Sequence, residues 1–209
     1  MSGGRADWPF AIALAALAGF VDAVGFLRIG GLFVSFMSGN STQLAVDAAN
    51  GGGWWRMTAA LILAFVAGVM AAAVVSERLG RWAPAATILL TTALLAWAAL
   101  LMVGGTGAVL LAAAMGALNV VFQRDGRSIP ITYMTGTLVR LGQALAGALM
   151  GIAPRTGWLP YLLLWSGLMV GAGAGALAYA AVGTHALWGA TGFAFVLALA
   201  AAVQSATAR

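Results

Sequence analysis

The sequence predicts an all-α fold, a polytopic transmembrane helix bundle of about six spans. Hydrophobic residues make up 63% of the chain and charged residues only 7%, whereas a soluble domain carries roughly a quarter charged residues. The apolar residues fall into six runs, most of which are long enough to cross a bilayer: 9–27, 57–75, 83–103, 108–122, 158–182 and 186–203. We therefore expect one membrane domain, residues 1–209, embedded in the lipid bilayer.

The first apolar run is expected to stay in the protein as a span. It contains Asp22, which the apolar centre of a cleaved signal peptide would avoid. It also has a counterpart later in the chain, in a position where no signal peptide can lie.

That counterpart belongs to an internal repeat with a constant offset of 97 residues. Gly19 falls on Gly116, Asp22 falls on Asn119, and the same offset aligns two motifs, Ser-Phe-Met-Ser-Gly at 35–39 and Thr-Tyr-Met-Thr-Gly at 132–136. The halves, about 9–103 and 106–206, are therefore predicted to be copies of one unit.

After a slip of two residues the alignment continues into the next apolar run. Phe-Val-Ala-Gly at 65–68 then faces Leu-Trp-Ser-Gly at 164–167.

The arginines indicate how the two copies are oriented. If the motif segments do not cross the membrane, seven arginines lie on one side and two on the other; if they do cross, the division is four against five. Because cytoplasmic loops are rich in arginine, the first division predicts three spans per unit, an inverted repeat and cytoplasmic termini. The larger group is Arg5, Arg78, Arg81, Arg124, Arg127, Arg155 and Arg209, and the smaller is Arg28 and Arg56.

Each motif predicts a broken or re-entrant segment, an extended entry followed by a short helix. Gly39 and Gly136 are expected to mark the breaks. Polar residues that favour helix N-termini lie at each start: Ser38, Asn40 and Ser41 in the first copy, and Thr135 and Thr137 in the second. Non-helical backbone at membrane depth is tolerated only when it is buried in protein or lines a wet cavity.

Two breaks that enter from opposite faces would bring free N–H groups and positive helix ends together, which favours a small polar or anionic solute. We expect the solute to contact a set of small polar residues and one arginine: Ser38, Gly39, Asn40, Thr135, Gly136, Thr137 and Arg140. The alternative interpretation is that these Ser, Thr and Gly residues only permit close helix packing.

Polar groups inside apolar sequence are costly and usually face a cavity or a partner. The repeat places Asp22 opposite Asn119, and Arg140 opposite Gln43. Each half has a polar residue at both of these positions, but only one of the two residues is charged. This asymmetry predicts a coupling or gating role for Asp22, Asn119 and Gln43. The alternatives are that Asp22 anchors the outer interface and that the Arg140 side chain extends to the inner one.

Glycines at four-residue spacing are typical of close helix contacts. They occur at Gly167, Gly171 and Gly175 and again at Gly147 and Gly151, and they are candidate faces for a homo-oligomer. The arginines form no cluster that could follow phosphates, which argues against nucleic acid.

The chain has no cysteine and no paired-histidine metal motif. It also lacks a Walker-type phosphate loop and a nucleophile with an adjacent base. We therefore expect no metal, no cofactor and no catalytic residue, so the protein is not expected to be an enzyme.

Two signatures resemble a known family. Residues 19–43, with Gly-Phe-Val-Asp and Phe-Met-Ser-Gly-Asn-Ser-Thr, and residues 133–142, with Tyr-Met-Thr-Gly-Thr-Leu and Arg-Leu-Gly, are similar to the YoaK-like family of bacterial inner-membrane proteins, a domain of unknown function. The resemblance implies a multi-pass inner-membrane protein and supplies no substrate. The sequence thus predicts a small transporter or channel for a solute or ion; the alternative is a non-transporting membrane subunit or assembly partner.

Overall fold

The computed structural model describes residues 8–101, 105–124, 127–128 and 131–207. It is built of α-helices, apart from two 3-10 turns, η2 (Gly80–Trp82) and η3 (Gly183–His185), and one antiparallel pair of two-residue strands, β1 (Gln123–Arg124) and β2 (Arg127–Ser128). The predicted all-helical class is confirmed. The helices are α1 (Trp8–Ile29), α2 (Met37–Asn50), α3 (Trp55–Leu79), α4 (Ala83–Leu100), α5 (Gly105–Leu118), α6 (Met134–Leu149), α7 (Leu159–Val182) and α8 (Ala186–Thr207).

Three helical segments are long and apolar enough to cross a membrane: 8–29, 55–100 and 159–207. The second and third each contain a reversal, because Gly80 and Gly183 adopt positive φ values of 50° and 59° and a 3-10 turn begins there. Each of these two segments therefore consists of two long helices. Together with α1 and the shorter apolar α5, they give six apolar helices in the described part of the chain, as the sequence predicts.

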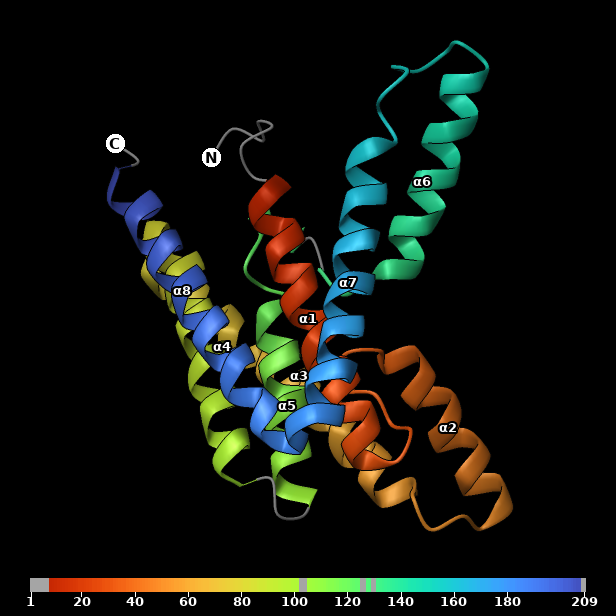
Figure 1. The fold of residues 1–209 in the computed structure, drawn as a ribbon, viewed down its shortest axis with the longest axis vertical. Coiled ribbons are helices and arrows are strands. Elements are labelled where there is room, and N and C mark those ends of the chain that lie inside the picture. Colours follow the sequence, from red (N-terminus) through yellow and green to blue (C-terminus); the bar gives the residue numbers. More distant parts are fainter. Residues whose placement is uncertain (1–7, 102–104, 125–126, 129–130, 208–209) are drawn as a thin grey trace.

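The long helices alternate in direction along the molecule (Figure 1). α1, α4 and α7 run one way, and α3, α5 and α8 run the other, so that α1 begins and α8 ends at the same end. α2 and α6 differ from these helices: each starts partway along the molecule and runs to an end, α2 toward the end that α1 approaches and α6 toward the end where α1 begins.

The core forms where helices of one half pack against helices of the other. α1 packs along α7, α3 packs along α5, and α4 packs along α8. Glycine permits the close approach: a methyl group on Gly171 would overlap the Ala16 carbonyl, and one on Gly68 would overlap the Ala113 carbonyl. Because lipid gives helices no hydrophobic reason to associate, such backbone contacts contribute much of the packing energy.

These contacts correct one detail of the sequence alignment. Gly19 lies against the Leu168 carbonyl, whereas Gly116 lies against the Phe65 carbonyl. Leu168 is therefore the counterpart of Phe65, and by the same test Gly171 is the counterpart of Gly68. The offset between α3 and α7 is 103 residues, four more than the sequence suggested, because glycines spaced by one helical turn allow two registers.

The glycine face of α7 is used inside the chain. Gly167 lies against Ile12, Gly171 against Ala16 and Gly175 against Phe20, all on α1. This face is therefore not available to a second copy, contrary to the expectation from its spacing. Gly147 of α6 packs on Ala153 of its own chain, and Gly151, where φ is +71°, has open space.

Candidate functional site

The first break is the loop 30–36 between α1 and α2, and it is held by Asp22. One carboxylate oxygen, Oδ1, accepts hydrogen bonds from the backbone amides of Val34 at 2.8 Å and Ser35 at 2.9 Å. The Ser35 side chain adds a further hydrogen bond to this carboxyl group. The loop enters through Gly30 and Gly31, where φ is 80° and 104°, a conformation that glycine adopts without steric cost.

Asn40 of α2 holds the same loop from its other side. Its Oδ1 accepts a hydrogen bond from the Phe33 amide at 3.0 Å, and its Nδ2 donates to the Phe33 carbonyl at 2.6 Å. Asn40 is buried, with 1% of its surface exposed. In the structure the Asn40 amide therefore replaces the backbone partners that Phe33 would have in a helix, and that it also contacts a solute stays a prediction.

The second break repeats this arrangement around Asn119. Its Oδ1 accepts a hydrogen bond from the backbone amide of Thr132 at 2.9 Å, and its Nδ2 donates to the Met115 carbonyl at 2.9 Å and to the Thr132 hydroxyl at 2.9 Å. Asn119 and Thr132 are the residues that lie 97 positions after Asp22 and Ser35. An amide oxygen and a carboxylate oxygen thus perform the same structural task in the two halves.

The short helices begin at Met37 and Met134, and no side chain caps either N-terminus. The prediction that polar side chains would cap them is wrong. Ser41 instead donates to the Met37 carbonyl at 2.8 Å, and Thr137 donates to the Tyr133 carbonyl at 3.2 Å. The hydroxyls are therefore bonded back along their own helices, and the first-turn amides are left to other partners.

Gly39 and Gly136 lie in the first turns of α2 and α6, after the breaks that they were expected to mark. Each has an aromatic ring of the preceding segment where a side chain would be: Phe36 for Gly39 and Tyr133 for Gly136. These glycines are required for space, since neither has a positive φ.

The remaining predicted solute contacts are divided between the two helices. Ser38 on α2 and Thr135 and Arg140 on α6 are exposed, and Thr137 is buried. α2 packs on α3, and α6 packs on α7. The two groups share no hydrogen bond among the described residues, so the expected convergence on one solute stays a prediction.

Gln43, the counterpart of Arg140, pairs with an acid. Its Nε2 donates to Oδ1 of Asp47 at 2.9 Å. The other carboxylate oxygen of Asp47 is buried without a hydrogen-bond partner. Asp47 is therefore buried, with 9% of its surface exposed, although it lies near the end of α2.

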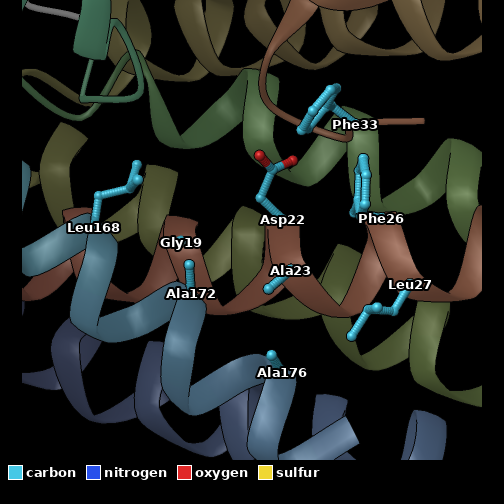
Figure 2. Close-up of a pocket in the computed structure, with 9 residues that line it drawn as sticks. All are labelled: Gly19, Asp22, Ala23, Phe26, Leu27, Phe33, Leu168, Ala172 and Ala176. Carbon is cyan, nitrogen blue, oxygen red and sulfur yellow. The ribbon is translucent and has the colours of Figure 1, made fainter. Parts of the chain in front are cut away.

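A cavity of about 340 Å³ lies beside Asp22, between α1, the first loop and α7 (Figure 2). The Asp22 carboxylate lies beside the Phe33 ring in this view, and the rings of Phe26 and Phe33 are 4.8 Å apart between centroids. The lining is otherwise aliphatic: Gly19, Ala23, Leu27, Leu168, Ala172 and Ala176. An acid in such surroundings is costly unless it is paired.

Residues 10–200 match the model of a family described as "Protein of unknown function (DUF1275)". The chain belongs to this family. It is also similar to the UPF0700 transmembrane protein RA0705 of Rhizobium meliloti (strain 1021), with 39% identity over 184 residues, which cover 84% of this chain and 77% of the relative. No solved structure matches. The matches confirm the family resemblance that the two signatures carry.

In this DUF1275 chain the first signature contains residues that hold the first break, whereas the second signature begins just after Thr132 and covers the start of α6. Asp22 and Asn40 lie in the first signature, and Thr137 lies in the second. These residues were predicted from the sequence, whereas the cavity was not. The aliphatic residues that line the cavity have no sequence pattern that predicts a site. The one sign of the cavity in the sequence is that Ala23 and Ala172 are smaller than the residues at the equivalent positions of the other half.

Proposed function

We propose that the chain is a small membrane transporter or channel in which a small polar or anionic solute binds beside the two broken segments. The observation that carries this proposal is the pair of short helices, which start partway along the molecule, run to opposite ends and have no side-chain cap. Broken helices that present their N-termini at the middle of a membrane are typical of transport sites.

The electrostatics of the two starts support this choice of solute. An α-helix carries about half a positive charge at its N-terminus, and its first amides are free to bind an anion or a carbonyl-type oxygen. Exposed hydroxyls of Ser38 and Thr135 lie in the first turns. Arg140 is six residues from the start of α6, about 9 Å along the axis, and adds a full positive charge on the same helix.

The proposal includes an inverted repeat of two three-span units. It is supported by the recurring contacts at Asp22 and Asn119 and by the opposite directions of α2 and α6. Arg78 lies in the last turn of α3 and Arg81 in η2, at the end of the molecule where α1 begins. By the positive-inside tendency, we place that end, with both termini, in the cytoplasm of a bacterium, and the chain in its inner membrane.

A second candidate, a non-transporting subunit, is favoured by the outer faces of α2 and α6. Val46, Leu138, Val139 and Leu145 are exposed there, beside polar side chains that fit poorly against lipid. A partner protein could cover such faces. Neither candidate includes a catalytic step or a cofactor.

Flux into liposomes distinguishes the two candidates. The purified protein is reconstituted, and uptake of radiolabelled formate, phosphate, sulfate and urea is measured against protein-free liposomes. Saturable uptake of one solute is the expected result. If the protein is folded in the liposomes and moves none of a broader solute panel, the transport proposal fails and the subunit interpretation replaces it.

A further inference from the structure

We propose that the cavity beside Asp22 is a binding site for a monovalent organic cation, an alkylammonium ion with apolar substituents. The site combines one carboxylate, two phenyl rings and an aliphatic wall. It adjoins the loop that leads into α2, through Phe33, but lies on the α1 and α7 side of that loop. Its occupation does not depend on transport, since a protein that moves no solute can still bind the cation here.

The first argument comes from comparing the two halves of the chain. With offsets of 97 for α1 and 103 for α7, Ala23 corresponds to Val120, and Ala172 corresponds to Val69. Val120 is buried in a cluster with Ala72 and Ala117, and Val69 packs against this cluster. The two valines thus fill, in one half, the space that two alanines leave open in the other.

The charged residue of the pair Asp22 and Asn119 lies in the half that has the cavity. Asp22 lines the cavity, whereas Asn119 lies in the half where Val120 and Val69 belong to one packed cluster. Asn119 holds the second loop without a charge, by accepting from the Thr132 amide and donating to the Thr132 hydroxyl. The negative charge of Asp22 is therefore not needed for the fold, and it costs free energy in an apolar membrane site. A bound cation would offset that cost.

The lining determines the kind of cation. A small inorganic cation prefers several oxygen ligands, and no cluster of three metal-binding side chains occurs among the described residues. Phenyl rings attract a cation that keeps little hydration, and Phe26 and Phe33 both line this cavity. Aliphatic walls formed by Ala172 and Ala176 favour alkyl groups. A volume of about 340 Å³ is within the range of small-molecule sites.

The test is calorimetric titration of the purified protein in detergent with tetramethyl-, tetraethyl- and tetrapropylammonium, and with sodium and sulfate for comparison. We expect one site that prefers the larger alkylammonium ions and takes neither sodium nor sulfate. Asp22→Asn copies the residue of the other half, keeps an acceptor for the loop, and should weaken binding by at least about tenfold.

A second variant, A23V combined with A172V, copies the filled half and leaves the carboxylate in place. It should also abolish binding, because the alkyl groups lose their space. The matched control is Val120→Ala, which loosens the uncharged half and should leave affinity unchanged. The proposal is overturned if no alkylammonium binds the folded wild-type protein, or if both the Asp22→Asn variant and the filled variant bind it as the wild type does. Flux measurements on the same samples test transport separately.

Discussion

The carboxylate of Asp22 accepts a hydrogen bond from the backbone amide of Ser35 at 2.9 Å, thirteen residues along the chain. Ninety-seven residues later, Asn119 makes the same contact with Thr132, also at 2.9 Å. In the first half a side chain of α1, and in the second half the residue directly after α5, thus replaces the helical partner that an amide in the following loop has lost. Irregular backbone at membrane depth requires such a replacement.

Asp22 should be essential as an acceptor and dispensable as a charge for folding. Asp22→Ala leaves the amides of Val34 and Ser35 unpaired, and each buried donor without a partner costs about 1–3 kcal/mol. We expect a clear fall in the apparent Tm in detergent, followed by tryptophan fluorescence. Asp22→Asn should keep a Tm near that of the wild type. Equal losses in the two variants would mean that the charge itself holds the loop.

Gly171 should be intolerant of any side chain, while its neighbour Gly173 should accept one. A methyl group at Gly171 would overlap the Ala16 backbone, whereas a methyl group at Gly173 meets nothing within 4 Å. Overpacking of this kind costs about 1–3 kcal/mol, so Gly171→Ala should lower the Tm. Gly173→Ala is the matched control and should leave the Tm unchanged or raise it. A stable Gly171→Ala protein would contradict the described packing of α1 on α7.

Arg140→Gln should impair solute flux while leaving expression and the Tm largely intact, because the Arg140 side chain is exposed on α6. The comparison is Arg155→Gln, also exposed, in the segment between α6 and α7, which should retain flux. Initial uptake rates in liposomes, normalised to the protein incorporated, measure the difference. Normal flux in Arg140→Gln would remove this arginine from the solute path.

The two loops that follow the short helices should lie on opposite sides of the membrane. The chain has no cysteine, so single cysteines report position directly. Gly53→Cys is preferable to Gly51→Cys, because Gly51 has a φ of +68° and Gly53 is exposed with open space around it. A membrane-impermeant maleimide applied to intact cells should label Gly53→Cys and spare Thr156→Cys. Labelling of both from one side would favour eight spans.

Much of the site could be predicted from the sequence, because the internal repeat aligns the residues that hold the two breaks. Offset 97 pairs Asp22 with Asn119 and Ser35 with Thr132 before any coordinates are known, and these are the contacts that hold the two breaks. The roles of Asn40 and Gly39 could not be anticipated. An asparagine that bonds to its own loop cannot be told from one that binds a solute by sequence alone. In the same way, a glycine that makes room for an aromatic ring cannot be told from one that breaks a helix.

The sequence by itself determined that the protein is a membrane helix bundle, how many long helices it has and between which of them the two broken segments lie, because hydrocarbon admits only long apolar helices and penalises polar groups without partners. Only the tertiary structure decided the register of α7 on α1 and the position of the cavity. Glycines repeated every turn permit several registers, and the choice among them depends on backbone contacts between segments about 150 residues apart. A cavity between side chains leaves no pattern in a single amino-acid sequence.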